Sequence, residues 1–336
     1  MNNAKPTLLI TGATGFVGSH LVEMALAQGF EVWAAIRQSS SLRYLQDPRI
    51  HLIELAFADA DALCQQVSAF KQSQNGEAWD YVVHAAGATK ARSEAEFIRA
   101  NADATRNLMD ALLKADAKPR RFVLMSSLSA VPMRDGMPAG NEAETAYGRS
   151  KLMAEAIVKE RLQEMDSVIL RPTGVYGPRE KDYFLMAKSI KQHTDFAVGF
   201  KPQEITFIYV RDLVEAILLA IEAKDVEGKA YFLSDGEVYH SRRFSDLLQQ
   251  EMGNPWVLHI KAPLWFLKTI CAISGTVSGW FGKTSTLNLD KYHILKQRNW
   301  QCDIEPARRD LGYHPEWPLE RGVKETVKWY KENKWL

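Results

Sequence analysis

Hydrophobic and polar positions follow two alternating periods along the first half of the chain. Short, continuous apolar runs are typical of buried strands, and apolar residues recurring every three to four positions are typical of amphipathic helices. Strands that alternate with helices predict an α/β fold, a doubly wound parallel sheet with helices on both faces. The predicted strands are Leu8–Ile10, Glu31–Ile36, Arg49–Leu55, Tyr81–Ala86, Phe122–Met125 and Val168–Leu170. The predicted helices are Phe16–Ala27, Asp59–Phe70, Glu94–Ala115 and Thr145–Glu164.

A glycine-rich turn joins the first predicted strand to the first helix. Glycine lets the backbone approach a ligand closely, and the N-terminus of the following helix favours a pyrophosphate. The G-x-x-G-x-x-G spacing differs from the common G-x-G-x-x-G, but strand, turn and helix together predict the dinucleotide loop of a Rossmann-type sheet. The residues expected to contact the cofactor here are Thr11, Gly12, Thr14, Gly15, Phe16, Val17 and Gly18.

The second half of the chain is less regular. Pro172, Gly174, Gly177 and Pro178 mark a loop after the sixth strand. We therefore predict an NAD(P)-binding Rossmann core at 1–171 and a mainly substrate-binding region at 172–336, with 205–235 returning to the core. Its expected elements are strands Phe207–Val210 and Ala230–Leu233, helices Asp212–Ile221 and Phe244–Glu251, and two short helices near Pro306 and Pro318.

The end of the second strand indicates which dinucleotide binds. An acid at this position binds the ribose 2′-hydroxyl of NAD, whereas an arginine accommodates the 2′-phosphate of NADP. Here Arg37 follows Ile36, and the segment up to Arg43 contains no acid. Because a guanidinium suits phosphate well, we expect NADP(H) in preference to NAD(H).

Composition excludes several other classes. Of the 336 residues, 46% are hydrophobic and 25% are charged. The net charge of +1 gives no excess of positive charge for binding nucleic acid. Cys64, Cys271 and Cys302 are too few and too scattered for a disulfide framework or a zinc site, so no metal is expected. With no signal-peptide pattern in the first residues, these features predict a cytoplasmic protein.

One segment, Leu264–Phe281, approaches the length of a membrane span and carries a single charge, Lys268. Gly275 and Gly279 dilute its hydrophobicity. A buried or substrate-lining helix is favoured, with contact with a membrane as the alternative.

A tyrosine and a lysine lie four positions apart in Tyr147-Gly148-Arg149-Ser150-Lys151, on one face of a predicted helix. A nearby ammonium favours the phenolate, which would lower the pKa of Tyr147 toward a working range. Ser127, at the end of the fifth strand, offers a hydroxyl to a substrate carbonyl. Asn101, on the preceding helix, is placed to order the lysine through water. On its own, a Tyr/Lys pair on a helix commonly lies on the protein surface without a function. The nearby Ser127 and Asn101 are what point to catalysis.

At this point the chain resembles the extended short-chain dehydrogenase/reductase family, essentially from end to end. TGATGFVG resembles the family's TGxxGxxG loop, and Tyr147 and Lys151 match its YxxxK. Ser127 falls at the catalytic Ser/Thr position and Asn101 at the structural asparagine. The segment RPTGVYGP from Arg171 resembles RPxxVYGP, and VRDL from Val210 resembles V-x-D-L near the substrate.

The resemblance implies a Rossmann domain, a C-terminal substrate region and a dimer formed through two helices of each subunit. It implies that Tyr147 transfers a proton to or from the substrate oxygen, that Lys151 binds the nicotinamide ribose, and that Ser127 polarises the carbonyl. Further cofactor contacts are expected at Phe57, Ala85, Ala86, Gly87, Pro172, Thr173, Gly174 and Val175. Candidate substrate contacts are Lys90, Ser129 and Tyr176. His84 is expected to be a core histidine.

Two departures bear on the substrate. Nucleotide-sugar enzymes of the family commonly carry an arginine where this chain has Glu204-Ile205-Thr206, and an asparagine where it has Thr173. Arg179, Lys181 and Lys201 remain possible substitutes for the missing cation. The aromatic segment near Trp265 and the C-terminal pattern around Tyr313 look more like the dihydroflavonol-reductase and 3β-hydroxysteroid-dehydrogenase branches.

We therefore predict hydride transfer between nicotinamide and a carbonyl or alcohol on an apolar small molecule. A nucleotide-sugar epimerase or dehydratase that uses its cofactor transiently is the first alternative. A non-catalytic NADP(H)-sensing regulator on the same fold is a remote one.

Overall fold

The computed structural model describes residues 5–131, 133–134, 137–138, 140, 143–200, 203–271, 292 and 299–336. Its centre is a seven-stranded sheet in which every neighbouring pair of strands is parallel. This confirms the predicted α/β fold. Across the sheet the strands are β13 (Ala230–Leu233), β8 (Ser167–Pro172), β5 (Arg121–Met125), β4 (Tyr81–His84), β1 (Thr7–Thr11), β2 (Glu31–Ile36) and β3 (His51–Glu54).

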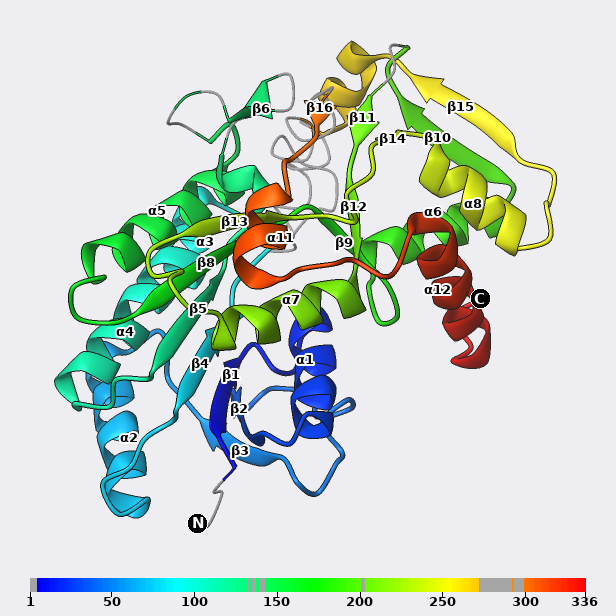
Figure 1. The fold of residues 1–336 in the computed structure, drawn as a ribbon. Helices are drawn as coiled ribbons and strands as arrows, with labels where there is room; N and C mark the ends of the chain where they lie inside the picture. The colour runs from blue at the N-terminus through cyan, green and yellow to red at the C-terminus, as the bar shows by residue number, and fades with distance from the viewer. Residues whose placement is uncertain are drawn as a thin grey trace.

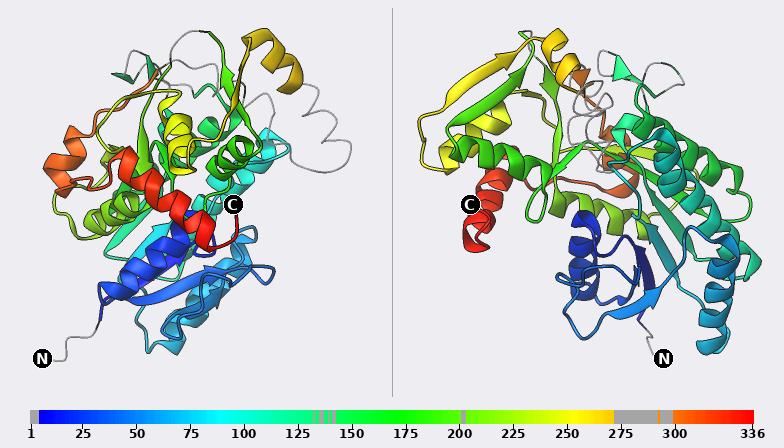
Figure 2. Two further views of the ribbon diagram at one scale, coloured as in Figure 1. Left: turned by 90° about the vertical axis from the view of Figure 1, so that its right-hand side faces the viewer. Right: turned by 180° about the vertical axis from the view of Figure 1, so that it is seen from behind.

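Helices cover both faces of the sheet (Figures 1 and 2). Successive strand residues point to opposite faces, so Leu8 and Ile10 of β1 enter one core and Leu9 enters the other. The first core is closed by α1 (Phe16–Ala27) and α7 (Val210–Glu222). The second is closed by α2 (Ala60–Ser73), α4 (Ala104–Lys114) and α5 (Ala146–Glu160). Burial on both faces explains the continuous apolar runs of the strands.

The helix predicted at Glu94–Ala115 is interrupted. It consists of α3 (Glu94–Ile98), a single π-helical turn at Arg99–Asp103, and α4. A π turn inserts one extra residue into a helix, and such turns are frequent at functional sites. Here the turn contains Asn101, which is buried.

The C-terminal region forms a third core beyond the carboxyl ends of the central strands (Figure 1). Its helices are α6 (Asp182–Lys191), α8 (Arg243–Glu251) and α12 (Leu319–Glu332). The paired strands are β9 (Gly174–Tyr176) with β12 (Phe207–Tyr209), β10 (Thr194–Val198) with β15 (Leu258–Ala262), and β11 (Glu204–Ile205) with β14 (Tyr239–His240) and β16 (Asn299–Trp300). The sequence pattern missed α6, β10 and β15. It also foresaw α12 as only a short helix.

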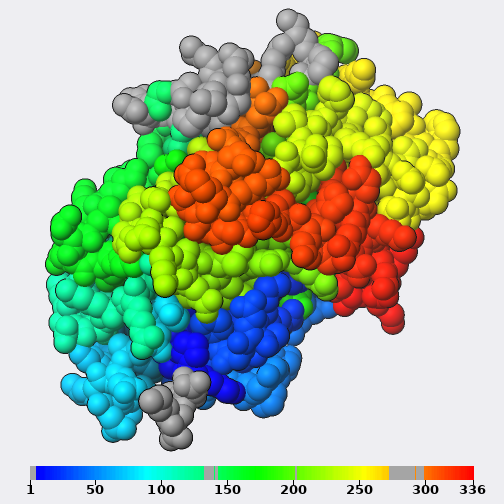
Figure 3. Space-filling view, viewed as in Figure 1, coloured from blue at the N-terminus to red at the C-terminus, as the bar shows by residue number. Residues whose placement is uncertain are grey.

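Parts of the second half pack on the central sheet. β13 extends the sheet beside β8, and α7 lies next to α1. A later helix, α11 (Glu305–Leu311), places Ala307 and Leu311 in the first core, where it covers α7 and β13 (Figure 3). The domain boundary at 171/172 stays a prediction.

Residues 264–271 of the apolar segment are helical, and residues 272–281 lie outside the described part. Leu267 and Cys271 are buried, whereas Trp265 and Phe266 are exposed, so the described part of the segment is only partly buried. Within the described ranges, no helix combines the length and apolarity that crossing a bilayer requires. Cys64, Cys271 and Cys302 are free thiols.

Candidate active site

The glycine loop is packed so tightly that side chains cannot enter it. Gly12 has φ +70°, and a Cβ there would lie 2.7 Å from the Ala85 carbonyl oxygen and from the Ala86 nitrogen. A Cβ on Gly18 would overlap the Gly12 carbonyl oxygen. Gly15 donates its N–H to that same oxygen at 2.9 Å. The loop therefore leaves a backbone cradle bounded by β1, β4 and α1.

The start of α1 is electrostatically suited to an anion. Its N-cap is Gly15, which offers no side-chain cap, and no acid occupies its first turn. The unpaired N–H groups and the positive end of the helix dipole thus remain open to a pyrophosphate. On these grounds the residues present fit a dinucleotide cofactor.

Thr11 supports the cradle from beneath. Its buried hydroxyl accepts a hydrogen bond from the Ala86 N–H at 3.1 Å and lies 2.8 Å from His84 Nδ1. Burial, and then the charge of Lys151, lower the pKa of His84 to about 3, so the ring is neutral. His84 is therefore a core residue, as expected, although its Nε2 has no hydrogen-bond partner among the described residues.

The expected adenosine end of the site carries Arg37 and Phe57. Arg37 is exposed, and its backbone N–H donates to Ser40 Oγ at 3.0 Å. Within the described ranges its guanidinium makes no hydrogen bond or ion pair. The Ala56 N–H is already donated to Gln66, and the Phe57 carbonyl accepts from Asn107. With these backbone groups already hydrogen-bonded, the half-buried Phe57 ring is left to contact the adenine of the cofactor.

Ser127 and Tyr147 come together as the sequence predicts. Thr145 caps α5 by accepting the Gly148 N–H at 2.9 Å, which starts the helix just before Tyr147. The Tyr147 hydroxyl forms a hydrogen bond with Ser127, which lowers the pKa of Tyr147, but burial raises it more. The shift in the pKa of Tyr147 is thus set by burial and by Ser127, rather than by Lys151 as expected. The net pKa lies above the usual value for tyrosine, because a buried phenolate loses its hydration.

Lys151, four residues after Tyr147 on α5, is also buried. Its Nζ donates to the Met125 carbonyl at 2.8 Å, and burial lowers its pKa to about 8 while the carboxylate of Glu155 opposes that shift. A Cβ on Gly87 would lie 3.2 Å from this Nζ, so the loop after β4 lies directly over the ammonium.

Asn101 holds that loop in place. Its Oδ1 accepts the Ala88 N–H at 2.9 Å, and its Nδ2 donates to the Ala88 carbonyl at 3.1 Å and to Ser150 Oγ at 2.8 Å. Asn101 therefore ties the loop to α5 one residue before Lys151. The π turn brings the amide to this position.

A buried charge cluster that sequence reasoning missed lies one helical turn beyond Lys151. Glu155 is fully buried and accepts two hydrogen bonds from Arg171, at 2.9 and 2.5 Å. It also accepts one from Ser126 at 2.5 Å. The signal was present, because Glu155 follows Lys151 by four residues and shares its helix face.

The segment 172–175, which is expected to line the nicotinamide, is held in place by hydrogen bonds to Thr206. Thr173 Oγ1 donates to the Thr206 carbonyl at 2.9 Å and lies 2.8 Å from Thr206 Oγ1. Both threonines are buried, and Thr206 Oγ1 donates in turn to the Trp300 carbonyl at 2.6 Å. A Cβ on Gly174 would lie 2.5 Å from the Tyr183 hydroxyl. Pro172 and Val175 flank this anchor on β8 and β9.

The three predicted substrate contacts lie in different surroundings. Tyr176 is fully buried in the third core, where Phe244 and Gly322 pack on its ring, and its role as a substrate contact stays a prediction. Lys90 forms an ion pair with Asp182 at the start of α6. Ser129 donates its backbone N–H to Ser127 Oγ at 3.1 Å, which steadies that hydroxyl.

Asp212, in the VRDL motif, is bonded to the backbone of the C-terminal region. Its buried carboxylate accepts the backbone N–H groups of Glu316 and Trp317, both at 3.0 Å. It therefore fastens the chain that leads to α12.

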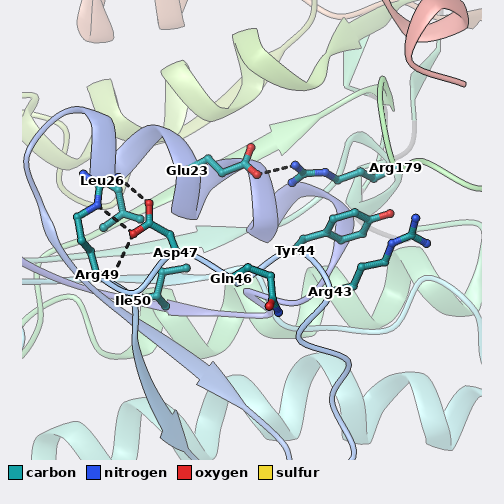
Figure 4. A pocket seen from close by; sticks show the side chains of 9 residues that line it. All are labelled: Glu23, Leu26, Arg43, Tyr44, Gln46, Asp47, Arg49, Ile50 and Arg179. Carbon is teal, nitrogen blue, oxygen red and sulfur yellow. Dashed lines mark hydrogen bonds and ion pairs between the residues drawn. The ribbon is translucent and has the colours of Figure 1, made fainter. Parts of the chain in front are cut away.

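A cavity of about 420 Å³ lies apart from these residues, on the flank of α1 (Figure 4). Its arginines are largely engaged, since Arg49 pairs with Asp47 and Arg179 pairs with Glu23. Arg179 also donates to Ser19 and lies over the Tyr44 ring. Thus Arg179, a possible substitute cation for a substrate diphosphate, is held at α1 instead.

A parallel sheet with a glycine cradle, followed by a Ser/Tyr/Lys group at the carboxyl ends of its strands, defines the class of extended short-chain dehydrogenases/reductases. The sequence profile of the NAD dependent epimerase/dehydratase family matches residues 8–233, and the chain belongs to that family. It is an NAD(P)-dependent enzyme of this family.

The chain is similar along its whole length to enzymes of different specificity. It is 26% identical to a 3 beta-hydroxysteroid dehydrogenase/Delta 5→4-isomerase of Mycobacterium tuberculosis, over 96% of this chain and 90% of that one. It is 27% identical to the sterol demethylase protein B of Methylococcus capsulatus, over 97% and 98%. The crystal structure of a UDP-glucose 4-epimerase from Thermotoga maritima superposes with a TM-score of 0.76 at 19% identity, covering 98% and 99%. This last likeness concerns the fold.

Proposed function

We propose that the protein catalyses NADP(H)-dependent interconversion of a carbonyl and an alcohol on an apolar small molecule. The observation that carries the choice of substrate is the hydrogen bond between Thr173 and Thr206. These two positions are where nucleotide-sugar enzymes of the family are expected to carry polar ligands. Here both side chains are buried and bonded to each other. Their hydroxyls are therefore not directed at a sugar diphosphate.

Two further observations favour an apolar substrate. Arg179 is held by Glu23 and Ser19, so it does not supply the missing cation. The relatives named above include proteins whose names refer to a hydroxysteroid and a sterol. An apolar ring system is the substrate class that these features share.

The bound cofactor would supply or accept a hydride, and the chain's own residues handle the proton. The raised pKa of Tyr147 keeps its hydroxyl protonated near neutral pH, ready to donate to a substrate oxygen during reduction. Ser127, which bonds Tyr147, would orient that oxygen. Lys151 supplies the positive charge that stabilises the phenolate after proton transfer.

The preference for NADP(H) is supported by Arg37. The guanidinium is exposed directly after β2, and the loop from Arg37 to Arg43 contains no acid. A 2′-phosphate would find a permanent cation there, whereas a 2′-hydroxyl would find no carboxylate.

We propose as well that the protein is a homodimer in the cytoplasm. Met153 is an exposed apolar residue on α5, available to an apolar contact between helices of two subunits. The three free thiols are in keeping with a reducing compartment.

The test incubates the enzyme with NADPH or NADH and a panel of ketosteroids and other apolar ketones, and separately with NADP+ or NAD+ and a panel of UDP- and dTDP-sugars. We expect net NADPH consumption with an apolar ketone, slower reaction with NADH, and a loss on the order of 10²-fold or more in turnover for Tyr147→Phe. Conversion of a nucleotide sugar without net cofactor consumption would instead establish the epimerase or dehydratase class. Faster reaction with NADH would refute the cofactor preference.

A further inference from the structure

The β10–β15 pair presents an apolar face to solvent. In its parallel register Thr194 faces Leu258, Phe196 faces Ile260, and Val198 faces Ala262. Because side chains alternate along a strand, these six share one face. Phe196 is 61% exposed and Leu258 is 51% exposed. A sheet usually turns such a face toward a core.

The opposite face of the pair carries Asp195, Ala197, His259 and Lys261, and it is packed against the protein at Asp195. Asp195 is buried there and accepts from Arg242 at 3.2 Å and from His259 at 3.1 Å. α6 lies against β10 on the inner side of the lobe, and the pair forms its outer edge (Figures 1 and 2). The apolar face is therefore outward by the register of the strands.

Exposed aromatic residues continue this face at both ends of the strands. Trp256, before β15, is 72% exposed, and Trp265, in the helix at 264–271, is 71% exposed. Phe200 and Phe266 are exposed as well, and the Gly199 N–H donates to the Ala262 carbonyl, so these segments adjoin. We call this surface, comprising Phe196, Val198, Phe200, Trp256, Leu258, Ile260, Trp265 and Phe266, the aromatic edge.

The charged residues of the two segments that carry the aromatic edge are mostly lysines. Residues 188–200 and 256–271 contain four lysines, Lys188, Lys191, Lys261 and Lys268, and all four are exposed. The single acid in these ranges is Asp195, which is buried and paired. The whole chain has a net charge of +1, so these two segments are more basic than the chain as a whole.

We propose that the aromatic edge docks the protein on an anionic lipid surface. Exposed tryptophan and phenylalanine flanked by lysines are the composition of interfacial membrane-binding segments. Anionic headgroups attract each nearby lysine, and the apolar side chains enter the boundary between headgroups and acyl chains. A second copy of the chain fits less well, because a two-fold contact would bring like-charged lysines together. The proposal concerns this surface and does not depend on the reaction.

The test is co-sedimentation of the full chain with vesicles of phosphatidylcholine alone or with about 30 mol% phosphatidylglycerol. We expect binding to the anionic vesicles that weakens as salt is raised. Phe196→Ser/Leu258→Ser and Lys268→Glu should each reduce partitioning at least about fivefold. The matched controls are Leu52→Ser, an exposed strand leucine of β3, and Lys224→Glu, an exposed lysine after α7; both should bind like the wild type.

Absence of wild-type binding to anionic vesicles at low salt would overturn the proposal. So would equal losses in the control variants, or binding that the aromatic-edge variants leave unchanged. Light scattering of the same proteins without vesicles tests the alternative that a second copy of the chain occupies this surface. A dimer that Phe196→Ser/Leu258→Ser dissociates would assign the surface to self-association instead. The substituted side chains are exposed, so circular dichroism should show unchanged folding.

Discussion

At the residue scale, Glu155 connects three parts of the site that lie far apart or unrelated in the sequence, namely the ends of β5 and β8 and the helix α5. It bonds Ser126, the neighbour of Ser127, and Arg171, the neighbour of Pro172, and it lies one turn beyond Lys151. A buried carboxylate with this many partners fixes the ends of β5 and β8 relative to α5. Glu155 is thus a positioning residue, and its charge also favours the ammonium form of Lys151.

The variant Glu155→Gln tests that role through pH. The pKa of Lys151 is about 8, so activity that needs the ammonium is present below that pH and is lost above it. Removing the Glu155 charge leaves Arg171 unpaired, and both changes lower the pKa of Lys151. We expect the basic limb of the kcat/KM profile to move to lower pH by about one unit. The measurement is initial rates of NADPH consumption across pH.

The matched control is Asp166→Asn. Asp166 accepts a hydrogen bond at 2.8 Å from the buried Arg121, the first residue of β5. This pair therefore lies at the amino ends of the strands, away from the site at their carboxyl ends. Its loss should lower stability without moving the pH profile. An unmoved profile in Glu155→Gln would reduce Glu155 to a purely structural residue.

At the scale of elements, the glycine loop and α1 act as one unit. α1 begins without a side-chain cap, and Gly18 in its first turns lies against the Gly12 carbonyl oxygen. This close approach explains why glycines stand at positions 12, 15 and 18. Each glycine therefore serves the packing of the loop on the helix.

Gly18→Ala should therefore damage cofactor binding more than its size implies. The added methyl group pushes the loop away from α1 and costs on the order of 1–3 kcal/mol of stability. We expect affinity for NADPH, measured by calorimetry, to fall about tenfold or more. Gly29→Ala is the control, because Gly29 has φ +92° but open space around it. It should lose stability to backbone strain, and it should bind NADPH like the wild type. Equal affinity in both variants would contradict the role of Gly18.

At the scale of the whole molecule, buried titratable groups fasten the C-terminal region to the central sheet. His20 on α1 bonds the Pro178 carbonyl at 3.0 Å, and Asp212 on α7 accepts from Glu316 and Trp317. Burial, followed by the charge of Arg179, lowers the pKa of His20 to about 4. Burial raises the pKa of Asp212 to about 6. These two groups respond to pH in opposite directions.

The signs give a testable prediction. The stability from His20 is complete above its unfolded pKa of 6.5 and is lost as pH falls toward 4. The contribution of Asp212 is complete below its unfolded pKa of 3.8 and is lost as pH rises through about 6. Relative to the wild type, Asp212→Asn should therefore become less stable at pH 5 than at pH 7.5, by a difference on the order of 1 kcal/mol. His20→Asn should show the opposite difference.

Urea unfolding of the three proteins at both pH values measures these differences. A variant at the exposed His240 serves as the control and should follow the wild type. Parallel pH responses in Asp212→Asn and His20→Asn would contradict the assignment of the two shifts.

The sequence by itself determined the parallel sheet, the glycine loop and the Tyr147/Lys151 pair. Each depends on periodicity or on spacing within one strand, turn or helix, and short-range backbone geometry converts such spacing directly into position. Tertiary structure alone decided that Tyr176 is core, that Thr173 bonds Thr206 across 33 positions, and that Arg179 is held by Glu23 across 156. The register of β10 and β15 likewise made an outward face from two segments far apart in the chain. Such contacts depend on which distant elements pack together, and no local pattern of residues specifies that.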